Sequence, residues 1–201
     1  MSDDENIIRC LFDNLDSNNN LSLRRREQLS EEFKKIQNRV KQSGSVFTKY
    51  RKIFENQDKF ADYAKTNSEF GLNESDLRKN FNSFLIQYSL DYIEITKKFL
   101  LENLDPNSIL DGKRISRINT LGVLGHALSN QFNMPELLSL FPYEFRNVLG
   151  HGSYWWNEHD HFCYIDEDGI DRELQFGEFV SVIERFDRTH LLIFREYILR
   201  I

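Results

Sequence analysis

The longest regular pattern in the chain lies in residues 73 to 103, which read NESDLRKNFNSFLIQYSLDYIEITKKFLLEN. Apolar residues recur in it every three or four positions, which predicts one amphipathic helix over residues 74 to 103. The residues of the apolar face are Leu77, Phe81, Phe84, Leu85, Tyr88, Tyr92, Ile95 and Phe99. Asn73 is a good N-cap, with Asp76 three residues on, and Asp105-Pro106 ends the element.

Shorter helices are predicted before and after this one. They cover residues 4–15, 22–43, 46–65, 113–130 and 136–140, and a stretch from Pro142 to about Gly150-His151-Gly152. Gly44 is expected to break the second from the third. Only three prolines and nine glycines occur in 201 residues, which suits long helices because both residues interrupt them.

The pattern changes after residue 160. Residues 161 to 176 alternate between apolar and polar around Asp166-Glu167-Asp168-Gly169, which predicts a β-hairpin. Residues 177 to 199 return to helical spacing. We therefore expect an all-α fold with one small hairpin before the C-terminal helix.

The composition is that of an ordinary globular protein, with 40% hydrophobic and 29% charged residues. A chain of this length can form one sizeable domain without a disulfide or metal to hold it together. Cys10 and Cys163 show no metal-binding spacing, so we expect two reduced thiols in a cytoplasmic protein. No signal peptide is evident, and no apolar run approaches the roughly 18 residues of a membrane span.

The charge is unevenly distributed along a chain whose net charge is −6. Residues 21–54 hold ten Lys or Arg against three Glu, whereas residues 150–201 hold eleven acidic and five basic residues. The basic segment 21–54 is compatible with a phosphate-binding surface. It is equally compatible with a solvated face that docks on the acidic part of a partner subunit.

Arg146 and His151 stand in an R-x₄-H spacing, which is a weak signal by itself because Arg185 and His190 share it. Arg185 is expected in the middle of a helix, where residues five apart point to different faces. Arg146 is followed by the polar Asn147 and lies one turn before a glycine-flanked helix end. The backbone there is expected to bend His151 back toward Arg146, at a helix end free to face a cleft.

The stretch Phe145-Arg146-Asn147-Val148-Leu149-Gly150-His151-Gly152 resembles the motif of the HEPN family. That family is an all-helical bundle with an R-x₄₋₆-H motif and usually Asn, Asp or His directly after the Arg. Many relatives also place a short hairpin and a long helix after the motif, as residues 161–199 do here. The resemblance implies a HEPN-like core over residues 73–201, with residues 1–72 as an N-terminal helical extension, the two forming one compact unit.

The resemblance implies a metal-independent endoribonuclease without a cofactor that works as a homodimer on RNA. The 2′-hydroxyl of RNA is the nucleophile, so the protein needs only to move protons and stabilise charge. His151 would act as general base or acid, Arg146 would bind the phosphate oxygens, and Asn147 would orient the histidine or hold the phosphate. Defence, stress response or a toxin–antitoxin pair, with an antitoxin or other partner subunit, is the implied setting.

The run Tyr154-Trp155-Trp156 could stack RNA bases, although such aromatic residues more often lie in a core or interface. Tyr154 and Trp155 are the candidate substrate-binding residues. Relatives paired with a nucleotidyltransferase antitoxin carry His-x-Tyr, in which the Tyr is modified. This chain is one residue longer between His151 and Tyr154, so Tyr154 is expected only to line the cleft.

Two other features are predicted to be structural. The run His159-Asp160-His161, with Glu158 and Cys163, has the composition of metal ligands, but no second ligand pair with recognised spacing accompanies it, so no metal is expected. His126, inside an apolar helix, is expected to be a core histidine.

The main alternative to the enzyme is a non-catalytic HEPN module that binds RNA or dimerises for a partner enzyme, which the acidic C-terminal segment favours.

Overall fold

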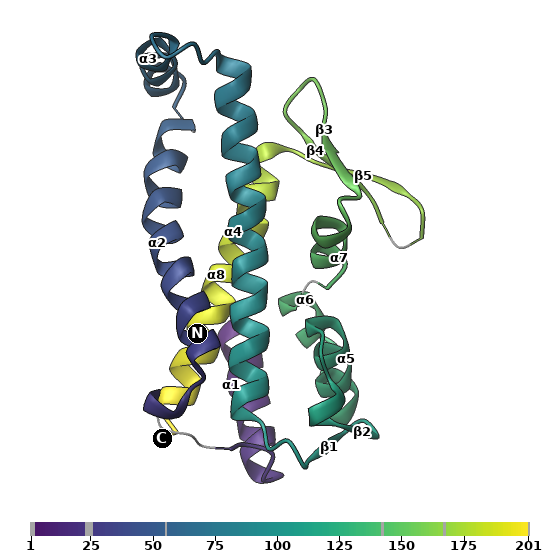
Figure 1. Ribbon diagram of the computed structural model, residues 1–201. Helices are drawn as coiled ribbons and strands as arrows, with labels where there is room; N and C mark the ends of the chain where they lie inside the picture. Colours follow the sequence, from purple (N-terminus) through teal and green to yellow (C-terminus); the bar gives the residue numbers. More distant parts are fainter. Residues whose placement is uncertain (1–2, 23–25, 55, 142, 167, 201) are drawn as a thin grey trace.

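The computed structural model describes residues 3–22, 26–54, 56–141, 143–166 and 168–200. It is mostly helical and carries a small antiparallel sheet, as the sequence predicts (Figure 1). Several residues of the sequence predictions, namely Arg24, Arg25, Pro142 and Glu167, lie outside the described part.

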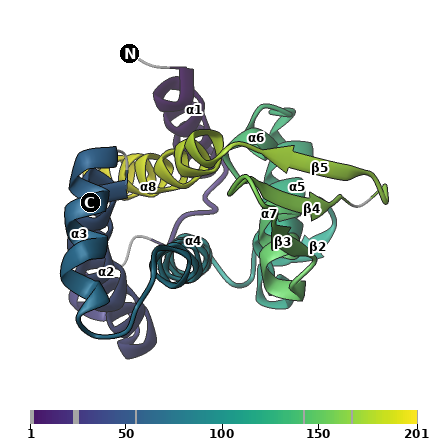
Figure 2. The same cartoon turned by 90° about the horizontal axis from the view of Figure 1, so that it is seen from above.

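The helix α4 (Glu74–Asn103) matches the prediction at both ends and stands at the centre of the fold (Figure 2). Its 30 residues give it a length of roughly 45 Å. The side chain of Asn73 accepts a hydrogen bond from the Asp76 N–H at 3.0 Å, and the Asp76 carboxylate accepts one from the Asn73 N–H, which completes a capping box. The predicted apolar face is buried, with Phe84 half-buried.

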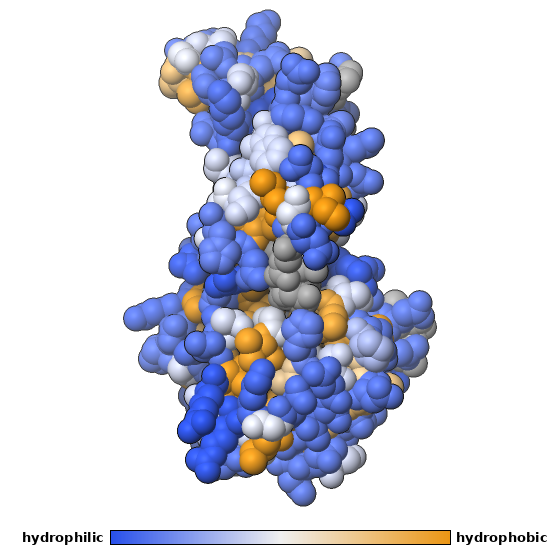
Figure 3. All heavy atoms as spheres, turned by 90° about the vertical axis from the view of Figure 1, so that its right-hand side faces the viewer, coloured by the Kyte–Doolittle hydropathy of each residue, from blue (hydrophilic) through white to orange (hydrophobic). Residues whose placement is uncertain are grey.

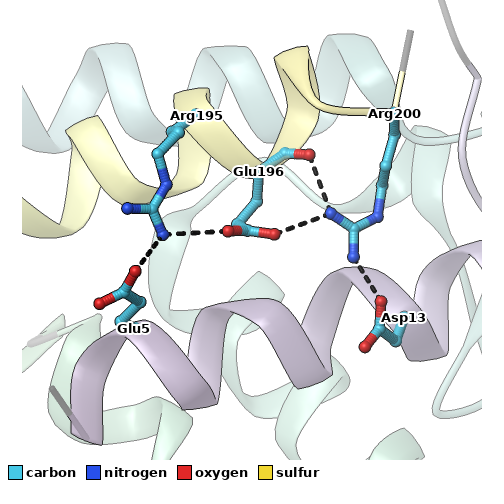
Figure 4. Close-up of polar contacts among 5 residues, drawn as sticks. All are labelled: Glu5, Asp13, Arg195, Glu196 and Arg200. Atoms are coloured by element: carbon cyan, nitrogen blue, oxygen red, sulfur yellow. Dashed lines mark hydrogen bonds and ion pairs between the residues drawn. The ribbon is translucent and has the colours of Figure 1, made fainter. Parts of the chain in front are cut away.

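The N-terminal helix α1 (Asp3–Ser17) buries Ile8, Leu11, Phe12 and Leu15 and packs against the C-terminal helix α8 (Phe176–Ile198). A polar network joins the two helices (Figure 4). Glu196, whose side chain is 3% exposed, accepts hydrogen bonds from Arg195 and Arg200, and these arginines also bind Glu5 and Asp13 on α1.

The helix α2 (Glu31–Phe54) follows a short 3₁₀ turn, η1 (Arg26–Gln28), and runs straight through Gly44. The predicted break at Gly44 is therefore wrong. A Cβ at position 44 would lie 3.3 Å from the Tyr88 hydroxyl, so the glycine allows α2 to approach α4 closely. The break comes later, where Asn56 caps the N-terminus of α3 (Gln57–Ser68) by accepting from the Lys59 N–H.

The segment predicted as one helix over 113–130 is also different. Strands β1 (Ile109–Leu110) and β2 (Lys113–Arg114) form a small antiparallel pair, with Asp111 and Gly112 in the turn at positive φ. A 3₁₀ turn, η2 (Ile115–Arg117), follows, and α5 (Leu121–Phe132) begins only after Thr120, whose hydroxyl accepts from the Val123 N–H.

The remaining elements lie on one side of α4: α6 (Leu137–Leu140), α7 (Tyr143–His151) and three strands (Figures 1 and 2). The predicted hairpin is confirmed as β4 (Phe162–Ile165) paired antiparallel with β5 (Asp171–Leu174). A third strand, β3 (Tyr154–Trp156), pairs with the other edge of β4, so the sheet order is β3-β4-β5.

One buried core runs through most of the molecule. It includes Phe12 of α1, Phe33 of α2, Leu85 of α4, Phe145 of α7 and Ile183 of α8. A smaller cluster of Phe60, Ala64 and Leu77 lies between α3 and the start of α4. Residues on both sides of the proposed boundary at residue 72 share the main core, and the division itself stays a prediction. Among the described residues, no helix combines the length and apolar character needed to cross a membrane.

Candidate functional site

The motif that resembles the HEPN family lies on the short helix α7. Phe145, Val148 and Leu149 form its buried face, and the Phe145 ring lies 5.5 to 5.8 Å from the rings of Phe162, Phe179 and Phe186. These contacts fix the rotation of α7 about its axis. As a result Arg146 and Asn147 are half-buried, and Gly150 and His151 are exposed.

The helix ends where the sequence predicts, with His151 as its last residue. Gly152 then takes a positive φ of 68°, and the Ser153 N–H donates to the Val148 carbonyl at 3.1 Å, as expected of a glycine at a helix C-terminus. The turn of the backbone therefore comes after His151, and the imidazole belongs to the last helical turn.

This geometry corrects one expectation. Because Arg146 and His151 are five residues apart in a continuous helix, their side chains leave the axis about 140° apart. The expected bend of His151 back toward Arg146 is wrong, and no hydrogen bond joins the two among the described residues.

Asn147 lies between the arginine and the histidine on the polar face of α7. Arg146 Nη1 donates a long hydrogen bond of 3.5 Å to Asn147 Oδ1. The guanidinium also passes over Gly150, where an added Cβ would lie 3.5 Å from Nη1. Asn147 stands one helical turn before His151, so the two side chains project from the same side of the helix.

The second R-x₄-H pair is built differently. Arg185 forms an ion pair with Asp4 at 3.0 Å on the surface, whereas His190 is only 6% exposed. The arginine of this pair therefore faces solvent and the histidine faces the core, as their positions in the middle of α8 predict.

The three aromatic residues after the motif alternate along β3. Tyr154 is half-buried and stacks on Phe162 at 5.5 Å, and Trp156 packs against Phe162 and Phe179. Trp155 points to the other face of the strand and is 44% exposed. Figure 3 shows the side of the molecule that carries α5, α6, α7 and the sheet, where hydrophobic patches lie between hydrophilic side chains.

The histidines outside the motif occupy three environments. His161 Nδ1 contacts the Glu173 carboxylate, and the His159 ring lies 6.0 Å from the His161 ring. His126 is exposed on α5, so its assignment to the core is wrong. The core histidine is His190, whose ring packs near Tyr92 and Phe99.

The basic segment 21–54 is partly neutralised within the chain. Arg39 forms an ion pair with Asp91 of α4 at 2.7 Å, and Arg51 pairs with Glu184 of α8. Lys41 and Lys52 are exposed and form no ion pair with any described residue. They line a cavity that the sequence analysis missed, between α2, α4 and α8.

Comparisons with protein family models, with curated proteins and with solved structures find no match for this chain.

Proposed function

We propose that this chain is a HEPN-like, metal-independent endoribonuclease whose catalytic residues are Arg146, Asn147 and His151. The observation that carries the proposal is the polar face of α7. There an arginine, an asparagine and an exposed histidine gather on the last two turns of a helix whose opposite face is anchored in the core. These three types of side chain suffice for cleavage of RNA by its own 2′-hydroxyl.

In the proposed reaction, His151 takes the proton of the 2′-hydroxyl or delivers one to the leaving 5′-oxygen. The 2′-oxygen attacks the phosphorus, and the P–O5′ bond breaks. Arg146 holds the non-bridging oxygens while negative charge builds on them, and Asn147 keeps the guanidinium in place. The products are a 2′,3′-cyclic phosphate and a 5′-hydroxyl end.

The angle between the two side chains favours a site shared by two chains. Because Arg146 and His151 leave the axis of one helix about 140° apart, we propose that they act on the same phosphate from two different chains. In a homodimer that places two α7 helices face to face, Arg146 of one chain and His151 of the other can meet at the same phosphate. Trp155, exposed on the next strand, is available to stack a base of the RNA.

The same divergence also favours a second candidate, a non-catalytic module that binds RNA or dimerises for a partner enzyme. Neither Arg146 nor His151 lines the cavities between α2, α4 and α8, between α2, α3 and α4, or between α4, α5 and α8. The motif therefore lies outside these three cavities, and its His151 is exposed, as a docking residue would be.

The experiment that separates these functions is cleavage of single-stranded RNA in EDTA. We expect the wild type to produce 2′,3′-cyclic phosphate ends, and Arg146→Ala and His151→Ala each to lose at least about a hundredfold in rate. Arg117→Ala and His159→Ala are matched controls, because they remove exposed residues of the same type elsewhere on the surface. Equal cleavage by the wild type and all four variants would contradict the proposed ribonuclease activity. The non-catalytic module would then be the remaining candidate.

Mixing the two inactive variants tests the shared site. In a heterodimer of Arg146→Ala and His151→Ala, one site keeps both residues and the other keeps neither. Random exchange of subunits should then restore roughly a quarter of the wild-type rate. A mixture as inactive as its components would show that each chain needs its own pair.

The proposed setting is the cytoplasm, in defence, stress response or a toxin–antitoxin pair with an antitoxin or other partner subunit.

A further inference from the structure

A cavity of about 740 Å³ lies between α2, α4 and α8, away from the α7 motif. Figure 2 places these three helices together, while α7 and the sheet lie on the other side of α4. We call this cavity the α2–α8 cleft. Its floor comes from α4, through Tyr88, Tyr92 and Ile95, and α2 and α8 supply its walls.

Several aromatic rings line the cleft. The Phe47 ring of α2 stacks on Tyr88 at 5.0 Å, and Tyr88 meets Tyr92 edge to face at 4.8 Å. The Tyr88 hydroxyl donates to the Tyr92 oxygen at 3.2 Å, and Tyr92 forms a hydrogen bond with Asp187. These tyrosine hydroxyls are engaged with each other and with α8, so the floor is largely apolar.

In His190 of α8, unlike in these tyrosines, one polar ring atom has no hydrogen-bond partner among the described residues. Thr96 Oγ1 gives its only proton to the Tyr92 carbonyl at 2.9 Å, so it can only accept from His190 Nδ1, 3.2 Å away. The proton of the neutral imidazole is therefore on Nδ1, and Nε2 is a hydrogen-bond acceptor. The side chain is 6% exposed, it lines the cleft, and Nε2 meets no donor among the described residues.

The rim of the cleft is positively charged in a protein whose net charge is −6. Four basic side chains line it, against the two carboxylates Glu184 and Asp187. Both carboxylates are engaged, Glu184 with Arg51 and Asp187 with Tyr92. Lys41 and Lys52 of α2 are the basic residues that form no ion pair with any described residue.

We propose that the α2–α8 cleft binds a small organic anion with a flat aromatic body and an N–H or O–H donor. The body packs against the aromatic lining of the cleft, the donor bonds to His190 Nε2, and the anionic group faces Lys41 and Lys52. The volume lies within the range of about 300–1,000 Å³ that is common for small-molecule sites. This inference does not rest on the proposed ribonuclease.

The first test uses 8-anilinonaphthalene-1-sulfonate, which combines an aromatic body, a sulfonate and an N–H donor. Titration of the full chain should give a saturable fluorescence increase at one site per chain. Lys41→Gln/Lys52→Gln should weaken binding about tenfold, because each surface cation contributes up to about fivefold. The control, Lys35→Gln/Lys49→Gln, removes the same charge from the same helix outside the cleft and should bind as the wild type does.

The second test isolates His190 with a matched pair of competitors. 4-Aminobenzoate carries the donor and benzoate lacks it, and both carry the carboxylate. In the wild type, 4-aminobenzoate should displace the fluorescent probe about fivefold better than benzoate. In His190→Asn, which keeps a polar group near Thr96 but does not reach the position of Nε2, the two should compete equally. His190→Gln, which returns an amide to that position, should recover part of the preference.

Two results would overturn the proposal. One is unsaturable probe binding, or binding that is equal in the wild type and the Lys41→Gln/Lys52→Gln variant. The other is a preference for 4-aminobenzoate that persists in His190→Asn. The lysine variants change exposed side chains, so they decide the question even if a substitution at position 190 prevents folding.

Discussion

Replacing His190 should flatten the dependence of stability on pH. Burial lowers the pKa of His190 to about 4, because the charged imidazolium would lose its hydration inside the α2–α8 cleft. In the unfolded chain the pKa of the histidine returns to its ordinary value of 6.5. The folded state therefore binds fewer protons than the unfolded state between these values. Stability is fully present above pH 6.5 and is lost as the pH falls toward 4.

The size of this effect follows from the two pKa values. A shift of one unit corresponds to about 1.4 kcal/mol, so the full contribution is about 3 kcal/mol. Between pH 7 and pH 5, His190 alone should lower the free energy of unfolding by about 2 kcal/mol.

The assay is urea unfolding of the wild type and His190→Gln at pH 7, 6 and 5. The variant cannot titrate at this position, so its free energy of unfolding should fall by about 2 kcal/mol less than that of the wild type. His126→Gln removes an exposed histidine and leaves His190 in place, so it should keep the wild-type slope. Parallel pH profiles for the wild type and His190→Gln would refute the reasoning.

Three further predictions concern stability and can be checked by urea unfolding at pH 7. Glu196→Gln should lower the free energy of unfolding by about 2 kcal/mol, because it removes the charge from a buried carboxylate that binds two arginines. Asp13→Asn, at a 63% exposed side chain of the same network, should lower it by less than about 1 kcal/mol. Asn73→Ala should cost about 1 kcal/mol by removing the N-cap of α4, and an unchanged midpoint would contradict the role of the capping box. Phe162→Ala should cost about 3–5 kcal/mol, because its ring is fully buried, whereas Ile165→Ala, on the same strand but 45% exposed, should cost less than about 1 kcal/mol.

The parts of the fold that were predicted correctly are those in which local signals decide the structure. The helix α4 begins and ends where its cap and periodicity place it, because Asn73 satisfies the first N–H groups and the apolar face continues unbroken to Phe99. The β4–β5 hairpin and α8 were also predicted, because alternation and helical spacing change sharply at residues 161 and 177.

The error at Gly44 came from a contact between two helices. Gly44 was expected to end a helix, but its lack of a side chain lets α2 approach the Tyr88 hydroxyl, and tertiary packing outweighs the roughly 1 kcal/mol cost of glycine in a helix. The pattern over 113–130 did not separate an apolar helix from the short strand pair and 3₁₀ turn that precede it. Thr120 was the available signal, as a capping residue directly before the apolar run.

Helical periodicity alone could have distinguished the buried histidine from the exposed one. The residues three and four positions from His126 are Gly122, Val123, Ser129 and Asn130, which make a weak apolar face. The corresponding neighbours of His190 are Phe186, Asp187, Ile193 and Phe194, three of which are large and apolar. The sequence could therefore have identified His190 as the buried histidine. It could not reveal the cleft beside it, because α2 and α8 lie more than a hundred residues apart.

The R-x₄-H spacing has the same geometry at both of its occurrences, so it does not identify a site. Arg146–His151 and Arg185–His190 each lie within one continuous helix, and in each the two side chains diverge by about 140°. They differ in which face of the helix is buried. On α8 the histidine faces the core, whereas on α7 Phe145, Val148 and Leu149 occupy the core, and His151 stays in solvent with Asn147 one turn before it. Of the two pairs, only the one on α7 has a solvent-exposed histidine. Since the pair diverges within one chain, the proposed RNA cleavage would need a second chain, which is why subunit mixing is a sharper test of the proposal than either single substitution.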